Sequence, residues 1–476
     1  MPDNLLIIGG VAAGTKAAAT AHRKNPSARI LLLQDEADVS YSACGLPYWL
    51  VPSEAIPRQK LVARTPDAFR ADGIEVRTRH RVEEIDTKRA TVTVHDREAG
   101  HTYTEPFDKL LIATGAHALP LNVPMSDRAP AVVYLRSIAD ADRLSGLLPD
   151  VGRVVIVGGG YIGLEMAETF TRRGLRVTIV EMMPRIIPNF DEPIATAVQS
   201  TLRKHGVQVF TGVPVVELDR GHVVLADGTR IAADLVLAAM GVRPSTALAA
   251  AAGIKLGKTG AIAVSAGMKT NMTNIFAAGD CVESRHVLSN RPVWMPLGDV
   301  ANRQGRVAGI NMTGGPARFP GVLGTAIFQV FELAVARTGL GHADALDAGF
   351  DPVTEVVEAP SRARYMSKSR PLQVRLTADR ITGRLLGCQV VGEDAVDKTI
   401  DIMATALWGK LRTHDLSELD LAYAPPFSPV LAPSQVAGEV LNKIVSEARA
   451  AIGPHLACFR QKMNYYSLYR ESAFIS

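Results

Sequence analysis

The sequence predicts an α/β protein with two Rossmann-like domains followed by a C-terminal α+β domain. Residues 5–33 have the order strand, glycine turn, Ala-rich helix and strand, and residues 154–181 repeat it. In such a βαβ unit the helix N-terminus is positioned to receive a pyrophosphate. From about Gly321 onward the pattern changes to short strands and helices near 397–408 and 433–446, which is typical of an α+β domain.

The first βαβ unit carries an imperfect dinucleotide motif. Its first strand leads into a turn with Gly9 and Gly14, but Val11 occupies the middle position of G-x-G-x-x-G. The second strand ends at Gln34 and Asp35, where an acid usually bonds a ribose. The alternative is a tight strand–helix turn that binds no ligand.

The second unit matches the motif fully. Gly158, Gly160 and Gly163 are all present, and Glu181 follows about 20 residues on, as the dinucleotide motif requires. Glu181 can accept from both ribose hydroxyls and would repel a 2′-phosphate, so NADH is favoured over NADPH. Arg185 lies close enough to weaken that preference.

Two such units in one chain predict two dinucleotides, FAD and a nicotinamide. One further strand ends in the turn Thr114-Gly115, and another ends at Gly279-Asp280, whose carboxylate is a candidate partner for a flavin ribityl hydroxyl. Taken singly, each segment also fits a strand that is closed by ordinary turn residues. Their order around the second unit favours the flavin interpretation.

These motifs divide the chain into five segments. The expected boundaries are 1–118 for the first part of an FAD-binding domain, 119–240 for an NAD(P)H-binding domain, 241–320 for the second part of the FAD-binding domain, 321–446 for the C-terminal domain, and 447–476 for an extension of unknown role.

Composition excludes several other classes of protein. The 476 residues carry a net charge of only +4, which argues against nucleic acid as a partner. No apolar run approaches the ~18 residues of a membrane span, and the N-terminus lacks the basic region of a secretory signal. The 4 cysteines form no CxxC pair, so we expect a cytoplasmic protein without a disulfide framework or a metal site.

Cys44 is the candidate redox residue. It lies within residues 40–48, after the first βαβ unit, at the expected start of a helix whose N–H groups can stabilise a thiolate. No second cysteine follows within two helical turns, so a dithiol pair is unavailable. The remaining chemistry is a single cysteine that cycles through a mixed disulfide, a persulfide or a sulfenic acid. A buried structural thiol is the alternative.

Together these motifs resemble the single-cysteine branch of the flavin-dependent pyridine nucleotide-disulfide oxidoreductases. That branch contains coenzyme A disulfide reductases, NADH oxidases and peroxidases, and NAD(P)H-dependent sulfur, polysulfide or persulfide reductases. The resemblance extends from about residue 4 to about residue 443. It rests on residues 9–14, 40–48, 113–115, 158–165, 278–280, 301–305 and 421–428.

The resemblance implies a homodimer with shared active sites, in which the C-terminal domain is the dimerisation domain. Tyr423 matches the tyrosine that coenzyme A disulfide reductases place over the partner's cysteine, and Tyr365 matches their second tyrosine. A phenol can donate a proton to a departing thiolate. Packing at the interface is the alternative role for both. By the same resemblance, Glu165 lies near the nicotinamide.

The resemblance also bears on the substrate. Arg23 matches a position that meets the phosphates of coenzyme A, and Ser40 matches a substrate-binding position; a solvated helix end is the alternative for Arg23. Leu431 and Ala43 replace a lysine and an asparagine of the coenzyme A disulfide reductases. Ala12 occupies the position of the histidine that NADH peroxidases carry beside their cysteine.

The sequence therefore predicts an FAD-dependent NADH oxidoreductase that reduces a low-molecular-weight disulfide, persulfide or polysulfide through Cys44. NADPH is an alternative reductant. An NADH oxidase or peroxidase that reduces oxygen or peroxide is the alternative enzyme. A third class is an electron-transfer flavoprotein in which Cys44 takes no part.

Overall fold

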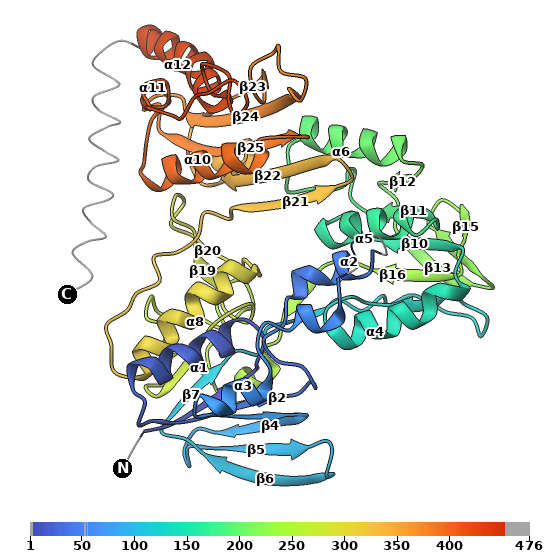
Figure 1. Ribbon diagram of the computed structural model, residues 1–476, viewed down its shortest axis with the longest axis vertical. Helices are drawn as coiled ribbons and strands as arrows, with labels where there is room; N and C mark the ends of the chain where they lie inside the picture. Colours follow the sequence, from blue (N-terminus) through green and yellow to red (C-terminus); the bar gives the residue numbers. More distant parts are fainter. Residues whose placement is uncertain (1–2, 52–53, 55, 453–476) are drawn as a thin grey trace. The chain divides into compact units, whose positions relative to one another are not determined.

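The computed structural model describes residues 3–51, 54 and 56–452, and the chain forms two compact units (Figure 1). The first unit comprises the chain up to residue 186 together with 205–286 and 290–322, and the second comprises 187–204, 287–289 and the chain from Leu323 onward. Two five-stranded parallel sheets lie in the first unit and a five-stranded antiparallel sheet lies in the second. The predicted fold class is confirmed.

The first parallel sheet is built mainly from apolar strands that are buried on both faces, as is usual for parallel sheets, and its edge strand Ile74–Thr78 is more polar and half-buried. Its strand order is β18-β7-β1-β2-β3. The bounds are Asn4–Ile8 for β1, Arg29–Gln34 for β2, Ile74–Thr78 for β3, Lys109–Ile112 for β7 and Ile275–Ala277 for β18. Leu5, Leu6 and Ile7 are 0% exposed.

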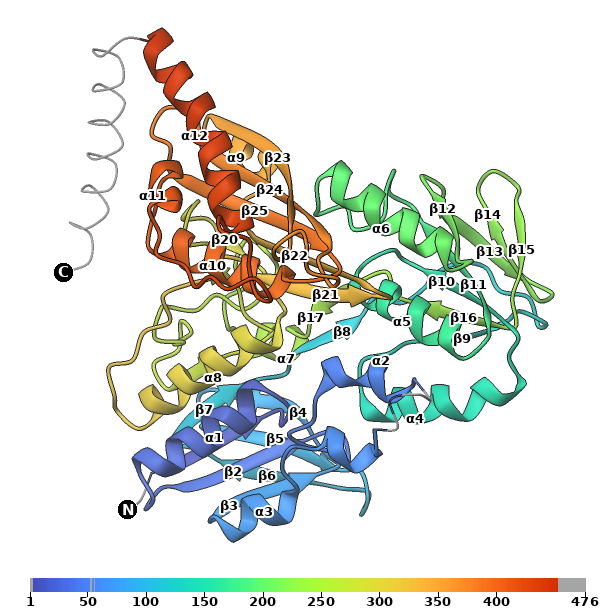
Figure 2. The same ribbon diagram turned by 45° about the horizontal axis from the view of Figure 1, so that its top comes forward.

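Two helices pack closely beside this sheet. They are α1 (Ala13–Lys24) and α8 (Gly298–Met312), which run side by side in both views (Figures 1 and 2). A Cβ added at Gly305 would lie 2.3 Å from the carbonyl oxygen of Ala13, and one at Gly309 would lie 2.5 Å from that of Ala17. Glycine therefore lets the two backbones approach, which fixes α8 against the helix that follows the first glycine turn.

The second parallel sheet repeats the arrangement with the strand order β12-β11-β10-β16-β9. The bounds are Ala131–Val133 for β9, Arg153–Val157 for β10, Arg176–Glu181 for β11, Gln208–Thr211 for β12 and Leu235–Ala238 for β16. Helix α5 (Tyr161–Arg172) connects β10 to β11, and helix α4 (Ile138–Leu147) begins at a capping box formed by Ser137 and Asp140. A capping box satisfies the free N–H groups at a helix start.

Smaller elements complete the first unit. They are α3 (Pro66–Ala71), α7 (Ala247–Ala251), the antiparallel sheet of β4 (His80–Asp86), β5 (Thr91–Asp96) and β6 (His101–Pro106), the sheet of β13 (Val215–Asp219), β14 (His222–Leu225) and β15 (Arg230–Ala232), the pair β8 (Ala116–Ala118) and β17 (Val242–Pro244), and the pair β19 (Ser284–Arg285) and β20 (Pro292–Val293).

The second unit is an antiparallel sheet with the order β21-β22-β25-β24-β23. The strands are β21 (Ala326–Val330), β22 (Leu333–Gly339), β23 (Pro352–Pro360), β24 (Pro371–Asp379) and β25 (Leu385–Gly392), and the helices are α6 (Glu192–Lys204), α9 (His342–Asp347), α10 (Val396–Trp408), α11 (Thr413–Ser417) and α12 (Pro433–Ile452). Cys388 and Val390 on β25 belong to the apolar core that α10 and α12 share. Gln389 between them points to the opposite face, because side chains alternate along a strand, and its Oε1 accepts from the backbone N–H of Asp191 at 2.9 Å.

Helix α12 continues beyond the predicted end at 446 and reaches Ile452. The first six residues of the 447–476 segment are therefore helical, and the remainder lies outside the described residues. Among the residues that the structure describes, no helix is long and apolar enough to cross a membrane.

The second glycine turn yields a stability prediction. Gly158 has φ +112°, and a Cβ at Gly163 would lie 2.2 Å from the carbonyl oxygen of Gly158, whereas a Cβ at Gly160 meets no atom within 4 Å. We expect Gly163→Ala to lower the Tm by about 5–10 °C because the backbone must shift. Gly160→Ala is the matched control, and thermal unfolding should show a Tm close to that of the wild type. Equal loss in both variants would contradict this account of the turn.

Candidate active site

The predicted flavin-site segments meet at the carboxyl ends of the first sheet's strands. The N–H of Ala113, just after β7, donates to the carbonyl of Ile8 at 2.8 Å, and the N–H of Ala278, just after β18, donates to that of Ile112 at 3.0 Å. Gly9, Thr114 and Gly279 each follow one of these strands. This edge is where open α/β sheets bind ligands.

The first glycine turn is held by Gln34. The N–H of Gly10 donates to Gln34 Oε1 at 2.7 Å, and the Gln34 side chain is 5% exposed. A Cβ at Gly14 would lie 1.8 Å from the carbonyl oxygen of Gly9, so the helix and the strand touch there. The two predicted glycines and Gln34 therefore form one arrangement.

Asp35 makes no contact with the first glycine turn and pairs with a residue elsewhere. Its carboxylate pairs with Arg97 at 2.8 Å, and its side chain is about half exposed. The next residue, Glu36, accepts from the Tyr41 hydroxyl at 2.7 Å, and burial raises the pKa of Glu36. Neither Glu36 nor Tyr41 is among the site residues predicted from the sequence, although Tyr41 lies inside the 40–48 motif.

Asp280 is fixed by a distant residue. Its carboxylate pairs with Arg136 at 2.6 Å, and Arg136 Nε also donates to the carbonyl of Ala116 at 3.2 Å. Thr114, in the neighbouring turn, donates its hydroxyl to the carbonyl of Ser245 at 2.7 Å, and Gly115 has φ +69°. Arg136 lies 144 residues from Asp280, so no sequence spacing indicated this pair.

The second glycine turn has the same construction. The N–H of Gly159 donates to Glu181 Oε2 at 2.8 Å, and the N–H of Met183 donates to Glu181 Oε1 at 2.8 Å. Each carboxylate oxygen has a second lone pair, so Glu181 keeps capacity to accept from a ribose. The structure brings Gly158, Gly163 and Glu181 together at this turn, and Gly160 faces open space.

Cys44 lies in a single 3₁₀ turn, Ala43–Gly45, directly before the short helix α2 (Leu46–Trp49). Its thiol is exposed to solvent, whereas Cys281 and Cys388 are buried. Burial raises the pKa of the Cys281 thiol to about 11, which makes it unreactive at neutral pH. Of these three thiols, only Cys44 is accessible to a substrate.

Helix α2 is docked on helix α5 by two hydrogen bonds. The Thr169 hydroxyl shares its proton between the carbonyl of Pro47 at 3.1 Å and that of Glu165 at 3.0 Å, and Arg173 Nε donates to the carbonyl of Leu50 at 2.6 Å. The last carbonyls of a helix have no partner within that helix. The helix that follows the second glycine turn therefore supplies these partners and fixes the segment that carries Cys44.

Glu165 lies one turn before Thr169 on α5 and acts on Cys44 electrostatically. Burial raises the pKa of Glu165 to about 7, and the nearby Glu168 adds to the rise. Protein atoms around Cys44 raise the pKa of its thiol, the negative charge of Glu165 raises it further, and Arg136 lowers it. The chain thus places a carboxyl group whose pKa is raised to about 7 within electrostatic reach of the candidate nucleophile.

Tyr423 and Tyr365 lie on adjoining loops of the second unit. The N–H of Ala363 donates to the carbonyl of Pro425 at 3.3 Å, which joins the two loops. Tyr365 is 77% exposed and Tyr423 is 50% exposed. Two large, accessible phenols on adjoining loops are unusual unless they meet a partner or a ligand.

The two predicted substrate residues lie on different elements. Arg23 is near the C-terminal end of α1, where its Nη2 donates to the Thr20 hydroxyl at 3.3 Å. About nine residues of helix, roughly 14 Å, separate it from Gly14 at the other end. Ser40 has the left-handed φ of +50°, and its N–H donates to the carbonyl of Gly10 at 2.8 Å. Such strain in a non-glycine residue is frequent near functional sites.

The turns fit the phosphates of two dinucleotides. A Cβ at Gly115 or Gly160 would meet no atom within 4 Å, so each turn borders open space that a ligand can enter. The close approach at Gly9–Gly14 and at Gly158–Gly163 brings a helix N-terminus to each turn. Outside residues 1–2, 52–53, 55 and 453–476, no cluster of His, Cys, Asp and Glu could hold a metal ion.

Known proteins share this architecture. Residues 3–305 match the pyridine nucleotide-disulphide oxidoreductase family, and residues 325–434 match its dimerisation domain. An NAD(P)H coenzyme A polysulfide/persulfide reductase of Pyrococcus horikoshii is 36% identical over 93% of this chain and 99% of its own. An NADH oxidase of Methanocaldococcus jannaschii is 33% identical over 93% of this chain and 99% of its own.

A solved structure agrees with these matches. The NAD-dependent persulfide reductase of A. fulgidus is 37% identical and superposes with a TM-score of 0.89, covering 92% of this chain and 83% of its own. Sequence and structure thus give the same relationship over nearly the whole chain. The protein belongs to the pyridine nucleotide-disulphide oxidoreductases and is an NAD(P)H-dependent oxidoreductase that resembles the coenzyme A disulfide reductases.

Proposed function

We propose that this enzyme uses NADH to reduce a low-molecular-weight disulfide, persulfide or polysulfide through Cys44. The observation that carries the proposal is the exposed Cys44 thiol at the start of a helix that is docked on α5. The relatives include a coenzyme A polysulfide/persulfide reductase and a persulfide reductase, which supports sulfur as the substrate.

The cofactors would be held by the two sets of turns. FAD would lie against Gly9, Gly14 and Gln34, with Thr114, Gly115, Gly279 and Asp280 at the neighbouring strand ends and Asp35 nearby. The reduced nicotinamide dinucleotide would lie against Gly158, Gly160, Gly163 and Glu181, with Glu165 toward its ring. The carboxylate of Glu181 supports NADH over NADPH because it would repel a 2′-phosphate.

The domain assignment follows from these sites. Residues 1–118 and 241–320 would form the FAD-binding domain, 119–240 the NAD(P)H-binding domain and 321–446 the dimerisation domain. Within the range 119–240, residues 187–204 belong to the second compact unit. The match of 325–434 to a dimerisation domain supports a homodimer.

FAD, when bound, supplies two-electron transfer between NADH and sulfur. The Cys44 thiolate attacks a sulfur–sulfur bond, forms a mixed disulfide and releases one thiolate. The mixed disulfide then takes up two electrons, which frees the second thiolate and regenerates Cys44. The balance is one NADH and one proton consumed for each disulfide, with NAD⁺ and two thiols as products.

The tyrosines would act on the partner's Cys44. The phenol of Tyr423 can protonate the departing thiolate, and Tyr365 on the adjoining loop can hydrogen-bond the mixed disulfide. Arg23 and Ser40 would contact the remainder of the substrate. The exposure of both phenols supports a role toward another subunit.

Oxygen or peroxide reduction is the second candidate. The 33% identity to an NADH oxidase supports it. Ala12 in the first glycine turn weighs against it, because alanine supplies no acid or base for peroxide chemistry. Under the main proposal, oxygen uptake is a slow side reaction.

Replacing the nucleophile tests the main proposal directly. We expect Cys44→Ser to abolish anaerobic NADH oxidation with coenzyme A disulfide, coenzyme A persulfide or polysulfide, while flavin content and slow oxygen uptake persist. Cys281→Ala is the matched control, because Cys281 is buried and should not be required. Undiminished turnover in Cys44→Ser, or a wild-type preference for glutathione disulfide or peroxide, would refute the proposal.

The charge of Glu165 predicts a pH-dependent thiol. Above pH 7 the ionised Glu165 raises the pKa of Cys44, whereas below pH 6 Glu165 is mostly neutral and has little effect. We therefore expect Glu165→Gln to speed the alkylation of Cys44 by iodoacetamide about 3- to 10-fold at pH 8 but not at pH 5.5. Glu168→Gln, one turn farther along α5, should change the rate less. Identical pH profiles for wild type and Glu165→Gln would rule out this coupling.

The shared site predicts complementation between inactive variants. We expect Tyr423→Phe to lower turnover about 10²-fold if the phenol donates a proton. Mixing subunits of Cys44→Ser and Tyr423→Phe should then restore roughly a quarter of wild-type activity, since half the dimers are mixed and each has one intact site. If the mixture after subunit exchange shows only the average activity of the two variant homodimers, Cys44 and Tyr423 of one site belong to the same subunit.

A further inference from the structure

Arg136 is held in place by both its side chain and its backbone. Its Nη2 pairs with the carboxylate of Asp280 at 2.6 Å, and its Nε donates to the carbonyl of Ala116 at 3.2 Å. Its backbone N–H donates to Asp140 Oδ2 at 3.0 Å, next to the capping box that starts α4. These contacts give the guanidinium a defined position.

The partner of Arg136 is an acid that is largely shielded from water. The side chain of Asp280 is only 14% exposed, and its backbone carbonyl accepts from Trp294 Nε1 at 2.7 Å. A carboxylate with so little water around it depends on a paired cation, because removing one partner of a buried pair leaves the other charge uncompensated. Arg136 supplies that cation.

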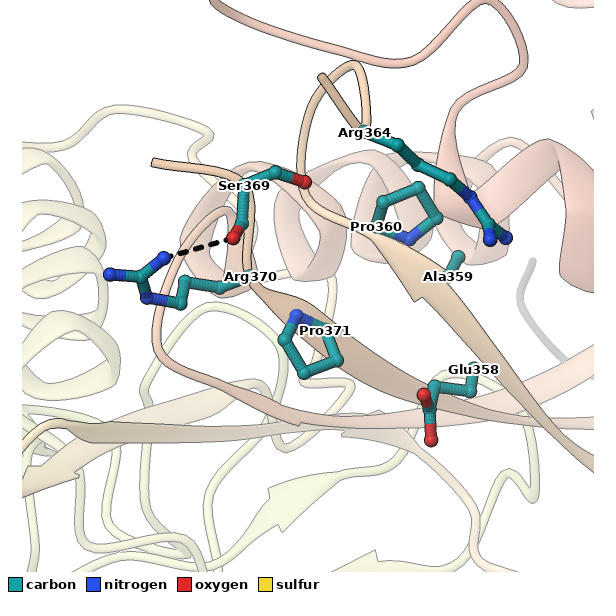
Figure 3. A pocket seen from close by; sticks show the side chains of 7 residues that line it. All are labelled: Glu358, Ala359, Pro360, Arg364, Ser369, Arg370 and Pro371. Atoms are coloured by element: carbon teal, nitrogen blue, oxygen red, sulfur yellow. Dashed lines mark hydrogen bonds between the residues drawn. The ribbon is translucent and has the colours of Figure 1, made fainter. Parts of the chain in front are cut away.

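An exposed arginine in the second unit shows the contrast. Arg370 pairs with Glu393 at 3.3 Å, and the two side chains are 46% and 43% exposed. Figure 3 shows its guanidinium bonded to the carbonyl of Ser369 beside a shallow groove of about 230 Å³. Water screens such a pair, so it contributes little energy. The charge of Arg136 is less screened, because Asp280 beside it has little contact with water.

Helix α4, which starts just after this arginine, is tied to the segment that carries Cys44. Arg58 pairs with Asp142 on α4 at 2.9 Å. A few residues farther along the chain, the carbonyl of Leu61 accepts from the N–H of Ser42, two residues before Cys44, at 2.8 Å. Both views show α2, which follows the Cys44 turn directly, beside α4 (Figures 1 and 2). The first half of α4 is therefore held close to the Cys44 segment.

The charges that act on the Cys44 thiol are mostly negative. They are three acids and one cation: Glu165 on α5, Asp280, Asp299 on α8 and Arg136. Burial raises the pKa of the thiol most, the acids add to the rise, and Arg136 opposes it. Tyr48 on α2 is uncharged at neutral pH, because burial raises its pKa to about 12. Arg136 is thus the cation that counters these three acids.

We propose that Arg136 is a positioning residue that keeps Cys44 reactive, by neutralising Asp280 and by adding a positive charge near the thiol. The thiolate is the nucleophile, so a nearby cation favours the attacking form. Loss of Arg136 would remove one positive charge and leave the negative charge of Asp280 uncompensated, and both changes disfavour the thiolate. As a contribution to turnover, the inference rests on the proposed function.

Alkylation measures the reactivity of Cys44 without turnover. In the holoenzyme we expect Arg136→Met to slow the alkylation of Cys44 by iodoacetamide about tenfold at pH 8, which corresponds to a rise of about one unit in the pKa of the thiol. The rates should converge as the pH rises and the thiol ionises in both proteins. Arg136→Lys keeps the charge and should restore most of the rate. Mass spectrometry of the peptide that contains Cys44 assigns the label.

Asp280→Asn tests the sign of the effect. This change removes a negative charge near the thiol and leaves Arg136 charged, so alkylation of Cys44 should become about threefold faster at pH 8. A general loosening of the site would change the rate in the same direction in Arg136→Met and Asp280→Asn, whereas the charges predict opposite directions.

Arg153→Met is the matched control. Arg153 also pairs with an acid at 2.6 Å, Asp234, but it lies at the start of β10, at the opposite end of that strand from the second glycine turn. The alkylation rate of this variant should stay within about twofold of the wild-type rate. Flavin content and thermal unfolding establish that each variant is folded.

The outcomes separate this inference from the proposed function. A wild-type alkylation profile in Arg136→Met, or equal slowing in Arg136→Met and Arg136→Lys, would overturn the role of Arg136. Disulfide turnover that persists in Cys44→Ser would overturn the proposed function, and the alkylation rates would still decide whether Arg136 acts on the thiol.

Discussion

The docking of α2 on α5 is the contact on which the arrangement of the candidate site depends. Thr169 and Arg173 donate to the carbonyls of Pro47 and Leu50, which a four-residue helix leaves without partners of its own. The same helix α5 begins at the second glycine turn and carries Glu165. One interface therefore sets both the position of Cys44 and the charge that acts on its thiol, and it links the segment after the first βαβ unit to the helix that follows the second glycine turn.

The two glycine turns show how a departure from a motif can keep its structural role. Gln34 accepts from the N–H of Gly10 just as Glu181 accepts from the N–H of Gly159. A neutral amide oxygen is sufficient for that bond, so the missing acid in the first unit leaves the turn intact. The difference lies in charge, because only Glu181 would repel a phosphate on the ribose.

The second unit combines a buried apolar core with exposed loops that carry the two candidate tyrosines. Cys388 and Val390 are packed into its core, and the raised pKa of Cys388, which burial causes, makes that thiol unreactive. The loops of Tyr365 and Tyr423 lie at the surface and are joined by the Ala363–Pro425 hydrogen bond. The proposed subunit association and substrate recognition would share these loops and leave the core undisturbed.

The sequence alone determined the two βαβ units, the antiparallel domain and Cys44 as the candidate nucleophile, because periodicity, glycine turns and a missing second cysteine are local features. Tertiary structure decided what distant segments contribute. Arg136 meets Asp280 across 144 residues, Thr169 meets Pro47 across 122, and α6 joins the second unit although β11 and β12 flank it in the sequence. It also showed that Glu36 accepts a hydrogen bond from the Tyr41 hydroxyl, while Asp35 forms an ion pair with Arg97. Such contacts depend on how the chain closes in space, and no local spacing encodes them.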